Sequence, residues 1–403
     1  MEHRLIHGIE KALGWSGPSQ LGAAFALGHI DDMEVCTRLL TPTRLLDLVM
    51  RRSLAPHRLR ILADGGDVHP QQYLPISTAR RGWGVPMADM RRVGGFLRSG
   101  CTLILDEVNT YDPTMEVACR ALQWWADELV QVNCYLTTGT SGGFNLHWDD
   151  HDVLVVQLAG EKAWEVRGLS RVAPMYRDAE PNLEPSEETV WTGIMRPGDV
   201  MHIPRGYWHR ATREDRGDGF SLHATFGIPK RTGVDWLTWV ADQGRERELL
   251  RHDLLRTGTD AQRNDQRLDL LDEAIRLVTS QPIAEFLTRR NIQRPAARHI
   301  QTHSLFGPLT DVVCVTEFAP LIERGDESVV VAAGGRRITF AAAALPALDI
   351  FLGGSPVSVA DAVAAVGDSA AVVARALVDE DICAELTPEL ASGYADMVTA
   401  QVR

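Results

Sequence analysis

The chain has few cysteines and no long apolar run, and these shortages exclude several classes of protein. The amino-terminal stretch MEHRLIHGIEKALGW is amphipathic and charged, without the apolar centre of a signal peptide, and no stretch is long enough to span a bilayer. The sequence contains six scattered cysteines and no Cys-x-x-Cys pair, so neither a disulfide framework nor a cysteine-based zinc site is expected. We therefore expect a soluble protein of the reducing cytoplasm, with no membrane partner.

Positive charge is also scarce. The formal net charge of the 403 residues is −13. Affinity for a phosphate backbone comes from Lys and Arg that displace counterions, so an acidic chain is poorly suited to binding nucleic acid. The same charge favours a basic protein or peptide as partner.

The hydrophobic pattern divides the chain into three regions. Helices are expected over residues 40–52 and 114–130, where capping residues precede apolar positions at helical spacing. From about residue 131 to 228 the pattern changes to short strands separated by turns such as RPGD and PRG. Several short strands at this spacing are typical of a sandwich or barrel, and the jelly roll is the first candidate. The expected fold class is α+β, with a catalytic domain over residues 1–235.

The remaining residues form the other two regions. Residues 234–255 and 260–290 have the pattern of two long helices with mixed charged faces, so a helical region is expected over 236–300. Residues 301–403 combine a Gly-Gly hairpin at 327–340 with three short helical stretches, which indicates a winged-helix-like domain. This last region holds five Arg and no Lys against fourteen Asp and Glu, so we expect a structural or protein-contact role and no DNA binding.

The segment NLHWDDHDVLVVQL contains the first candidate site. Iron(II) oxygenases use two His and one carboxylate on one face of an octahedron. On a strand, His147 and Asp149 would point to the same side, because strand residues alternate faces. His-x-Asp alone has low specificity, and a second copy occurs at His29 to Asp31, in a stretch expected to be helical. His151 follows by two residues, and its role as substrate contact or solvated loop residue stays open.

The downstream context distinguishes the two copies. About 60 residues after His147 comes MRPGDVMHIPRGYWHRAT, in which two tight turns flank a short strand and His209 follows on the next strand. A jelly roll can bring a strand with His-x-Asp beside a later strand that carries a third ligand. The sequence therefore predicts that His147, Asp149 and His209 bind a metal ion.

The combination of HWD, PGDVMHIPRGYWH and FSLHATFG resembles the JmjC-type, cupin-fold 2-oxoglutarate oxygenases, and within them the branch of ribosomal oxygenases. That branch combines a JmjC domain, a helical dimerisation region and a carboxy-terminal winged helix, which implies a double-stranded β-helix and a homodimer here. By this resemblance, His147, Asp149 and His209 are catalytic iron(II) ligands.

The resemblance also implies contacts for 2-oxoglutarate. Lys162, fifteen residues past His147 and expected on the strand paired with the one before it, matches the residue that holds the distal carboxylate. Asn133 matches an amide that contacts the cosubstrate, and Tyr135 falls on a neighbouring position. Ser221, with His223, lies where the family has a similar Ser-x-His. A buried Lys suits this role because a dicarboxylate that chelates iron through one end needs a cation at the other.

The implied function is an iron(II)- and 2-oxoglutarate-dependent oxygenase that hydroxylates a protein or peptide side chain, with Arg or His of a ribosomal protein as the first candidate. An intact carboxylate at Asp149 favours hydroxylation over halogenation, whereas demethylation uses the same first step and stays open. The alternatives are a hydroxylase of a biosynthetic precursor peptide or carrier-bound amino acid, and a non-catalytic metal-binding cupin scaffold. Lys162 argues against the scaffold, which would have no use for a cosubstrate clamp.

Overall fold

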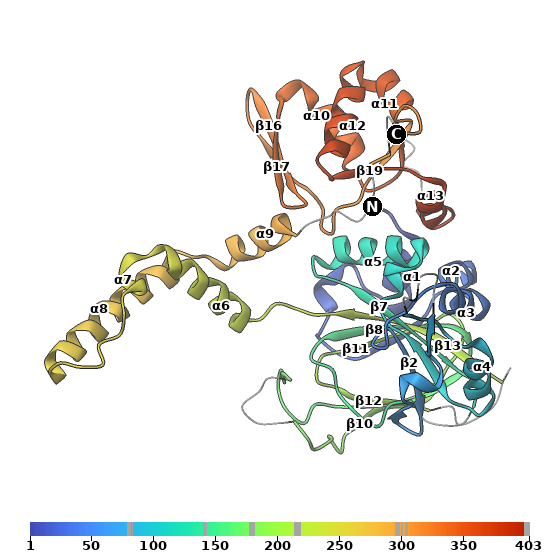
Figure 1. The fold of residues 1–403 in the computed structure, drawn as a ribbon. Coiled ribbons are helices and arrows are strands. Elements are labelled where there is room, and N and C mark those ends of the chain that lie inside the picture. The colour runs from blue at the N-terminus through green and yellow to red at the C-terminus, as the bar shows by residue number, and fades with distance from the viewer. Residues whose placement is uncertain are drawn as a thin grey trace.

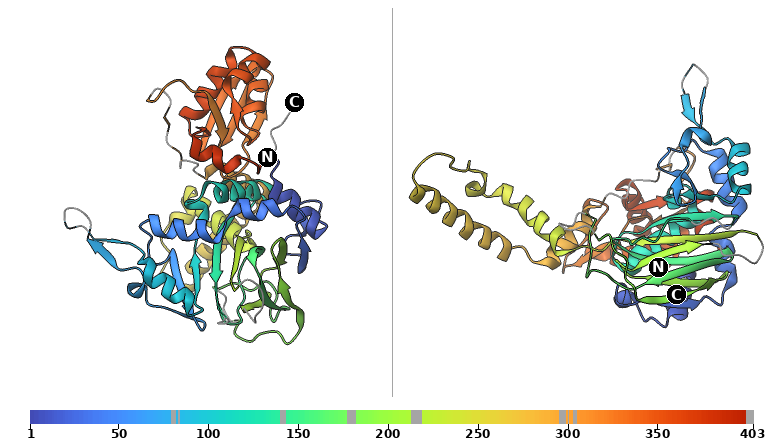
Figure 2. Two further views of the ribbon diagram at one scale, coloured as in Figure 1. Left: turned by 90° about the vertical axis from the view of Figure 1, so that its right-hand side faces the viewer. Right: turned by 90° about the horizontal axis from the view of Figure 1, so that it is seen from below.

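The computed structural model describes residues 1–78, 82, 84–139, 143–176, 182–212, 219–294, 299, 301–302 and 305–398. A β-barrel with a layer of helices forms the lower body in Figure 1, a carboxy-terminal domain lies above it, and a helical arm projects to one side. The two views in Figure 2 show the same three parts. No helix in these ranges has both the length and the apolar composition needed to cross a membrane.

Two sheets face each other in the barrel. The eight-stranded sheet has the order β1-β11-β8-β13-β7-β6-β2-β3, and the three-stranded sheet has the order β10-β9-β12. The strands of the larger sheet are β1 (Ala26–His29), β2 (Leu59–Ala63), β3 (Gly66–Asp67), β6 (Thr102–Leu105), β7 (Gln131–Thr137), β8 (Asp152–Gly160), β11 (Asp199–Ile203) and β13 (Ser221–Ile228). Those of the smaller sheet are β9 (Lys162–Arg167), β10 (Thr189–Met195) and β12 (Trp208–Thr212), and a separate hairpin pairs β4 (Ile76–Thr78) with β5 (Gly84–Pro86).

The chain crosses repeatedly between the two sheets. Strands β8, β11 and β13 belong to the larger sheet, whereas β9, β10 and β12 belong to the smaller one. At the first crossing, Gly160 has φ +63°, and a Cβ there would lie 1.9 Å from the carbonyl oxygen of Phe220. Only glycine fits this turn, because it has no Cβ and tolerates positive φ. The result is the double-stranded β-helix of a jelly roll, which confirms the predicted fold class.

Strand β8 shows why the barrel has two different faces. Its alternate residues Leu154, Val156 and Leu158 belong to the main core under the helices, whereas Val153 and Val155 point between the sheets. This follows from the period of two in a strand, and it explains why nearly every residue of β8 is apolar and buried. The inner set packs with residues of β9, β10 and β11 and forms one wall of the barrel interior.

Helices cover the outer face of the larger sheet. They are α1 (Arg4–Leu13), α2 (Met33–Leu39), α3 (Pro42–Arg51), α4 (Met90–Arg98) and α5 (Pro113–Ala126), with short 3₁₀ turns η1 (Pro18–Gln20), η2 (Pro70–Gln72) and η4 (Val108–Thr110). Asp112 caps α5 by accepting hydrogen bonds from the backbone N–H groups of Thr114 and Met115, and Pro113 occupies the first turn. Helix α5 runs between the barrel and the carboxy-terminal domain (Figure 1).

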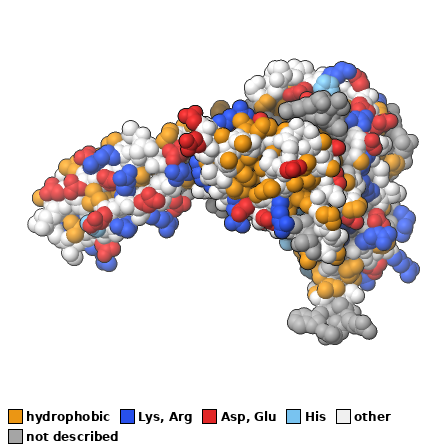
Figure 3. Space-filling view, turned by 90° about the horizontal axis from the view of Figure 1, so that it is seen from above, with side chains coloured by type: hydrophobic (Ala, Val, Ile, Leu, Met, Phe, Trp, Pro, Cys, Tyr) orange, Lys and Arg blue, Asp and Glu red, His pale blue; other side chains and the backbone are white. Residues whose placement is uncertain are grey.

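The arm consists of α6 (Gly233–Gln243), η5 (Gly244–Glu246), α7 (Glu248–Arg251), α8 (Asp260–Thr279) and α9 (Ile283–Gln293). Seen from above, acidic and basic side chains are intermixed on it (Figure 3). The carboxy-terminal domain contains β14 (Asp311–Cys314), β15 (Leu321–Arg324), β16 (Ser328–Ala333), β17 (Arg336–Ala341), η6 (Ala342–Ala344), α10 (Leu345–Phe351), β18 (Val357–Ser358), α11 (Val359–Val366), α12 (Ser369–Asp379), β19 (Cys383–Glu385) and α13 (Pro388–Tyr394). Its predicted hairpin and helices are present, and its winged-helix-like class stays a prediction.

Several expectations about local structure were wrong. The two long helices expected in the arm are each divided. The second breaks before Pro282, because a proline disfavours helical backbone at the residue before it. His29 lies in β1, not in a helix, and its Nδ1 is 2.8 Å from Oδ1 of Asp199. Strands β1, β2, β3 and β6 also join the main sheet, although strands in this part of the chain were expected only from about residue 131.

Candidate metal centre

His147 and His209 are joined through their backbones. His147 was expected within a regular strand, but it lies in an extended segment just before β8. It forms an isolated antiparallel bridge with His209 of β12. The backbone N–H of His147 donates to the carbonyl of His209 at 3.1 Å, and the N–H of His209 donates back at 2.7 Å. Directly opposed residues of an antiparallel pair have neighbouring side chains, so the two imidazoles come together.

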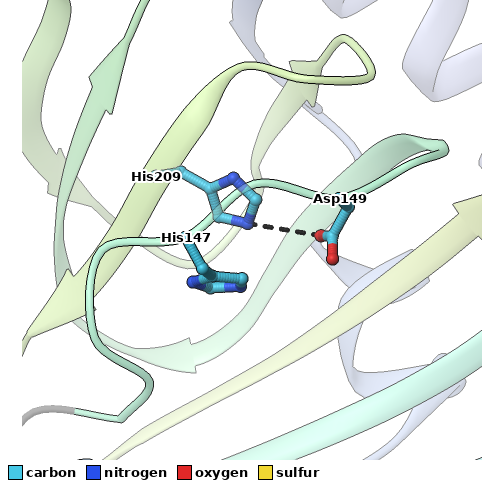
Figure 4. A group of neighbouring side chains, drawn as sticks. All are labelled: His147, Asp149 and His209. Carbon is cyan, nitrogen blue, oxygen red and sulfur yellow. Dashed lines mark ion pairs between the residues drawn. The ribbon is translucent and has the colours of Figure 1, made fainter. Parts of the chain in front are cut away.

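Asp149 completes the group from two residues farther along the same segment. Its carbonyl oxygen accepts a hydrogen bond from the N–H of Gly206, in the IPRG turn that precedes His209. The candidate ligand atoms of His147, Asp149 and His209 all lie within 4.8 Å of one another. His209 Nε2 is 3.4 Å from Asp149 Oδ2, and the two imidazole centroids are 4.4 Å apart (Figure 4). A single ion between these atoms would have two nitrogen ligands and one oxygen ligand.

The hydrogen bonds of the two imidazoles set their orientation. His147 Nδ1 is 2.8 Å from the carbonyl oxygen of Asn145, and His209 Nδ1 is 3.1 Å from that of Tyr207. Because a carbonyl oxygen only accepts, each Nδ1 carries a proton, and Nε2 is then the nitrogen through which either ring can bind a metal ion in its neutral form. Metal-binding histidines typically donate their other N–H in this way, so the arrangement fits a resident divalent ion.

The surroundings of His147 and Asp149 shift both pKa values toward the forms that bind a metal ion. Burial lowers the pKa of His147, and the neighbouring His209 lowers it further. Burial tends to raise the pKa of Asp149, but the hydrogen bond and charge of His209, with the charges of His151 and His147, hold it well below its usual range. Neutral imidazoles and an ionised carboxylate are the ligand forms of these side chains.

A cavity of about 310 Å³ opens from these three residues into the barrel, and Lys162 lies in its wall. The Lys162 side chain is buried, and its Nζ donates a hydrogen bond to Thr137 Oγ1 at 3.1 Å. The hydroxyls of Thr137 and Thr102 are 3.0 Å apart. Lys162 was expected on a strand paired with β8, and this expectation was wrong. Strand β9 pairs with β10 and β12, so Lys162 approaches the cavity from the opposite sheet.

The other predicted contacts are divided. Asn133 and Tyr135 line the cavity from alternate positions of β7, and Asn133 Oδ1 accepts a hydrogen bond from the backbone N–H of Glu107 at 2.9 Å. Burial raises the pKa of Tyr135 well above its usual range, so its hydroxyl stays protonated. Ser221 is buried and does not line this cavity, since its Oγ accepts a hydrogen bond from Gln157 Nε2 at 3.0 Å. His151 lines the cavity but lies outside the three-ligand group found among the described residues.

Two residues had not been assigned a role from the sequence: His223, which lines the cavity, and Thr137, which lies outside its lining and accepts the hydrogen bond of Lys162. His223 is buried, its ring stacks on Tyr135 at 4.7 Å between centroids, and its Nδ1 has no hydrogen-bond partner among the described residues. Burial and the charge of Lys162 lower the pKa of His223 well below its usual value, so the ring is neutral. Thr137 was also missed, although it follows Asn133 and Tyr135 at the same period of two.

Fold and site together define a class of protein: a double-stranded β-helix whose cavity is lined by two histidines and one carboxylate that can bind a metal ion. More particularly, residues 110–233 match the family model of the JmjC domain, and this part of the chain is a JmjC domain. The bifunctional lysine-specific demethylase and histidyl-hydroxylase NO66 of Drosophila willistoni is 33% identical over 139 residues, which cover 34% of this chain and 18% of that protein. The protein of the same name from Caenorhabditis elegans is 33% identical over 150 residues, which cover 35% of this chain and 19% of its own. The match therefore spans less than a fifth of these relatives.

The fold likeness extends much farther. The X-ray structure of E. coli ycfD covers 91% of this chain and 95% of its own, with a TM-score of 0.53 and 16% identity. The structure of YcfD, a ribosomal oxygenase from Escherichia coli, in complex with cobalt and 2-oxoglutarate covers 86% of this chain and 90% of its own, with a TM-score of 0.53 and 18% identity. At this identity, the comparison establishes a shared fold.

Proposed function

We propose that the protein is an iron(II)- and 2-oxoglutarate-dependent oxygenase that hydroxylates a side chain of a protein or peptide. The observation that carries this proposal is the presence of two different binding elements in one cavity: the His147, Asp149 and His209 group, and the buried cation of Lys162. A metal-binding scaffold would need only the first. The JmjC match over residues 110–233 supports the same reading.

Each element has a distinct task in this proposal. His147 and His209 would hold iron through Nε2, and Asp149 through a carboxylate oxygen. Iron with 2-oxoglutarate and oxygen supplies the oxidising power for C–H hydroxylation, and the protein supplies ligation and orientation. Lys162, which Thr137 holds in place through a hydrogen bond, would bind the distal carboxylate of the cosubstrate, because a charge-assisted hydrogen bond is the strongest that the cavity can offer. Asn133 and Tyr135 would add neutral contacts. Val153 and Val155 give one side of the cavity an apolar wall.

Anaerobic titration of iron(II) and 2-oxoglutarate into the purified protein tests this function. A visible charge-transfer band of the iron–2-oxoglutarate chelate is expected for the wild type, lost in His209→Ala and weakened in Lys162→Ala. A wild type that binds iron without developing the band would instead identify a metal-binding scaffold.

For the substrate, we propose a basic protein or peptide. A pocket beside the cavity shares Gln131 and His151 with it and is lined by three carboxylate residues, Glu107, Asp150 and Glu317, and by one basic residue, Arg294. With the net charge of −13, this surface favours a cationic chain. The relatives named for histidyl hydroxylation and for a ribosomal oxygenase make Arg or His of a ribosomal protein the first candidate. A precursor peptide or a carrier-bound amino acid is the alternative, and mass spectrometry for a gain of one oxygen on ribosomal proteins distinguishes them.

We also propose that the arm mediates homodimer formation. On α8, Leu268, Leu271, Ile275 and Val278 follow one another at helical spacing and are 37 to 56% exposed. An apolar stripe of this kind is normally covered by another helix. Light scattering at micromolar concentration should give a dimer for the wild type and a monomer for Leu271→Glu, whereas a monomeric wild type would contradict the proposal.

The remaining parts of the functional assignment follow from composition. We propose that the boundaries near residues 235 and 300 separate the catalytic, dimerisation and carboxy-terminal domains. We further propose a cytoplasmic location, which suits six buried free thiols, and a carboxy-terminal domain that contacts protein and not DNA. An electrophoretic mobility assay at low salt, where non-specific DNA binding is strongest, should show no complex.

A further inference from the structure

The loop between β9 and β10 forms hydrogen bonds with residues at and beside the candidate metal ligands. This β9–β10 loop covers residues 168–188, of which 168–176 and 182–188 are described. Trp148 stands between the ligands His147 and Asp149 in the sequence, and its indole Nε1 donates a hydrogen bond to the carbonyl of Asn182 at 2.9 Å. Its ring also packs against Tyr176, with the centroids 4.9 Å apart.

The same loop holds the second ligand segment. Trp208 directly precedes His209, and its indole Nε1 donates to Ser170 Oγ at 2.8 Å. The Ser170 hydroxyl in turn donates to Asn182 Oδ1 at 2.9 Å. A continuous set of hydrogen bonds therefore connects the residue before His209 with the residue between His147 and Asp149.

Tyr176 extends this set to a ligand side chain. Its hydroxyl lies 3.1 Å from Asp149 Oδ1 and 3.2 Å from the carbonyl oxygen of Trp148. The other carboxylate oxygen of Asp149, Oδ2, is the one nearest His209 Nε2. A hydrogen bond on Oδ1 fixes the rotation of the carboxylate and directs Oδ2 toward the position between the two imidazoles.

We propose that Tyr176 is a positioning residue for the metal ion, and that the β9–β10 loop holds the three ligands in binding geometry through Tyr176, Trp148 and Ser170. The identity of the ion as iron rests on the function proposed above, but the positioning role concerns any divalent ion at His147, Asp149 and His209. Groups that orient metal ligands typically change metal affinity by about 10- to 100-fold when removed. Because Tyr176 and Ser170 belong to the β9–β10 loop, metal affinity would depend on a loop that provides none of the three ligands.

The test is a titration of the metal-free protein with cobalt(II), followed by calorimetry and by the visible absorption of bound cobalt. Tyr176→Phe removes the hydroxyl and keeps the ring on Trp148, and we expect its cobalt affinity to fall about 10- to 100-fold with an altered cobalt spectrum. Tyr176 is 61% exposed, so the melting temperature of the metal-free variant should stay within about 2 °C of the wild type. Tyr111→Phe, which removes a hydroxyl from a residue outside the cavity lining, is the matched control and should bind cobalt as the wild type does.

Ser170→Ala provides a second, independent variant, because it interrupts the connection to Trp208 without changing any residue beside Asp149. It should also weaken cobalt binding, by less than Tyr176→Phe. Cobalt affinities of both variants within twofold of the wild type would overturn the positioning role while leaving the proposed oxygenase intact. A wild type that binds no cobalt at this group would overturn both.

Discussion

Replacing Lys162 by methionine should separate cosubstrate binding from metal binding. Methionine keeps most of the side-chain volume and removes the ammonium group that donates a hydrogen bond to Thr137 Oγ1. Lys162 is only 2% exposed, so water cannot readily replace this group. A hydrogen bond to a charged group contributes about 1.5–3 kcal/mol. Leaving the buried distal carboxylate of 2-oxoglutarate without a cationic partner would cost about 3–5 kcal/mol. Taking about 3 kcal/mol, 2-oxoglutarate should bind the variant about 100-fold more weakly.

The assay is anaerobic titration of 2-oxoglutarate into the iron(II)-loaded protein, with cobalt(II) affinity measured in parallel. The sequence contains only three lysines, and Lys11 offers the matched control, since its side chain is 66% exposed in a surface pair with Asp31. Lys11→Met should bind 2-oxoglutarate as the wild type does, and Lys162→Met should bind cobalt normally. A Lys162→Met protein that retained cosubstrate affinity within about threefold would refute the carboxylate role.

Further predictions concern the turn that places Lys162 and the buried histidine near the amino terminus. Gly160→Ala should lower the free energy of unfolding by at least about 2 kcal/mol and weaken 2-oxoglutarate binding, because the added Cβ would meet the Phe220 carbonyl. Gly95→Ala on α4 is the control: nothing lies within 4 Å of the added Cβ, so it should raise the free energy of unfolding by up to about 1 kcal/mol. Urea unfolding measures both effects. Burial lowers the pKa of His3 to about 3, against about 6.5 in an unfolded chain, so the stability that its neutral form contributes is complete above pH 6.5 and is lost as the pH falls. Between pH 7.5 and 5 the free energy of unfolding should fall about 2 kcal/mol more in the wild type than in His3→Gln, and equal pH slopes would contradict this.

The strands of the barrel were predictable because each carries its own local signal. Alternating apolar residues and the RPGD and IPRG turns located the strands from β7 to β13 to within a few residues. The spacing of His147, Asp149 and His209 was informative for the same reason, since the turns around His209 specify a short strand reversal. Which of these side chains bind a metal remains a prediction.

Other features depend on tertiary contacts that leave no mark on the local pattern. The sheet to which Lys162 belongs is decided by the turn at Gly160, so the expected pairing with β8 was wrong. Ser221 shares a strand with His223, yet its hydroxyl bonds to Gln157 from a neighbouring strand. Tyr176 lies in a loop, where the sequence carries no periodicity that could connect it with Asp149.

The reciprocal backbone hydrogen bonds between His147 and His209 have a consequence for metal selectivity. These bonds come from main-chain atoms of an antiparallel bridge, so they hold the two imidazoles together whether or not an ion is present. A preformed site has no folding step that could discriminate between iron(II) and other divalent ions. Nitrogen-rich sites bind nickel, copper and zinc more tightly than iron(II). Which metal the protein carries is then set by the supply of ions where it is made, and material purified on nickel resin would carry the wrong ion until it is stripped and reloaded.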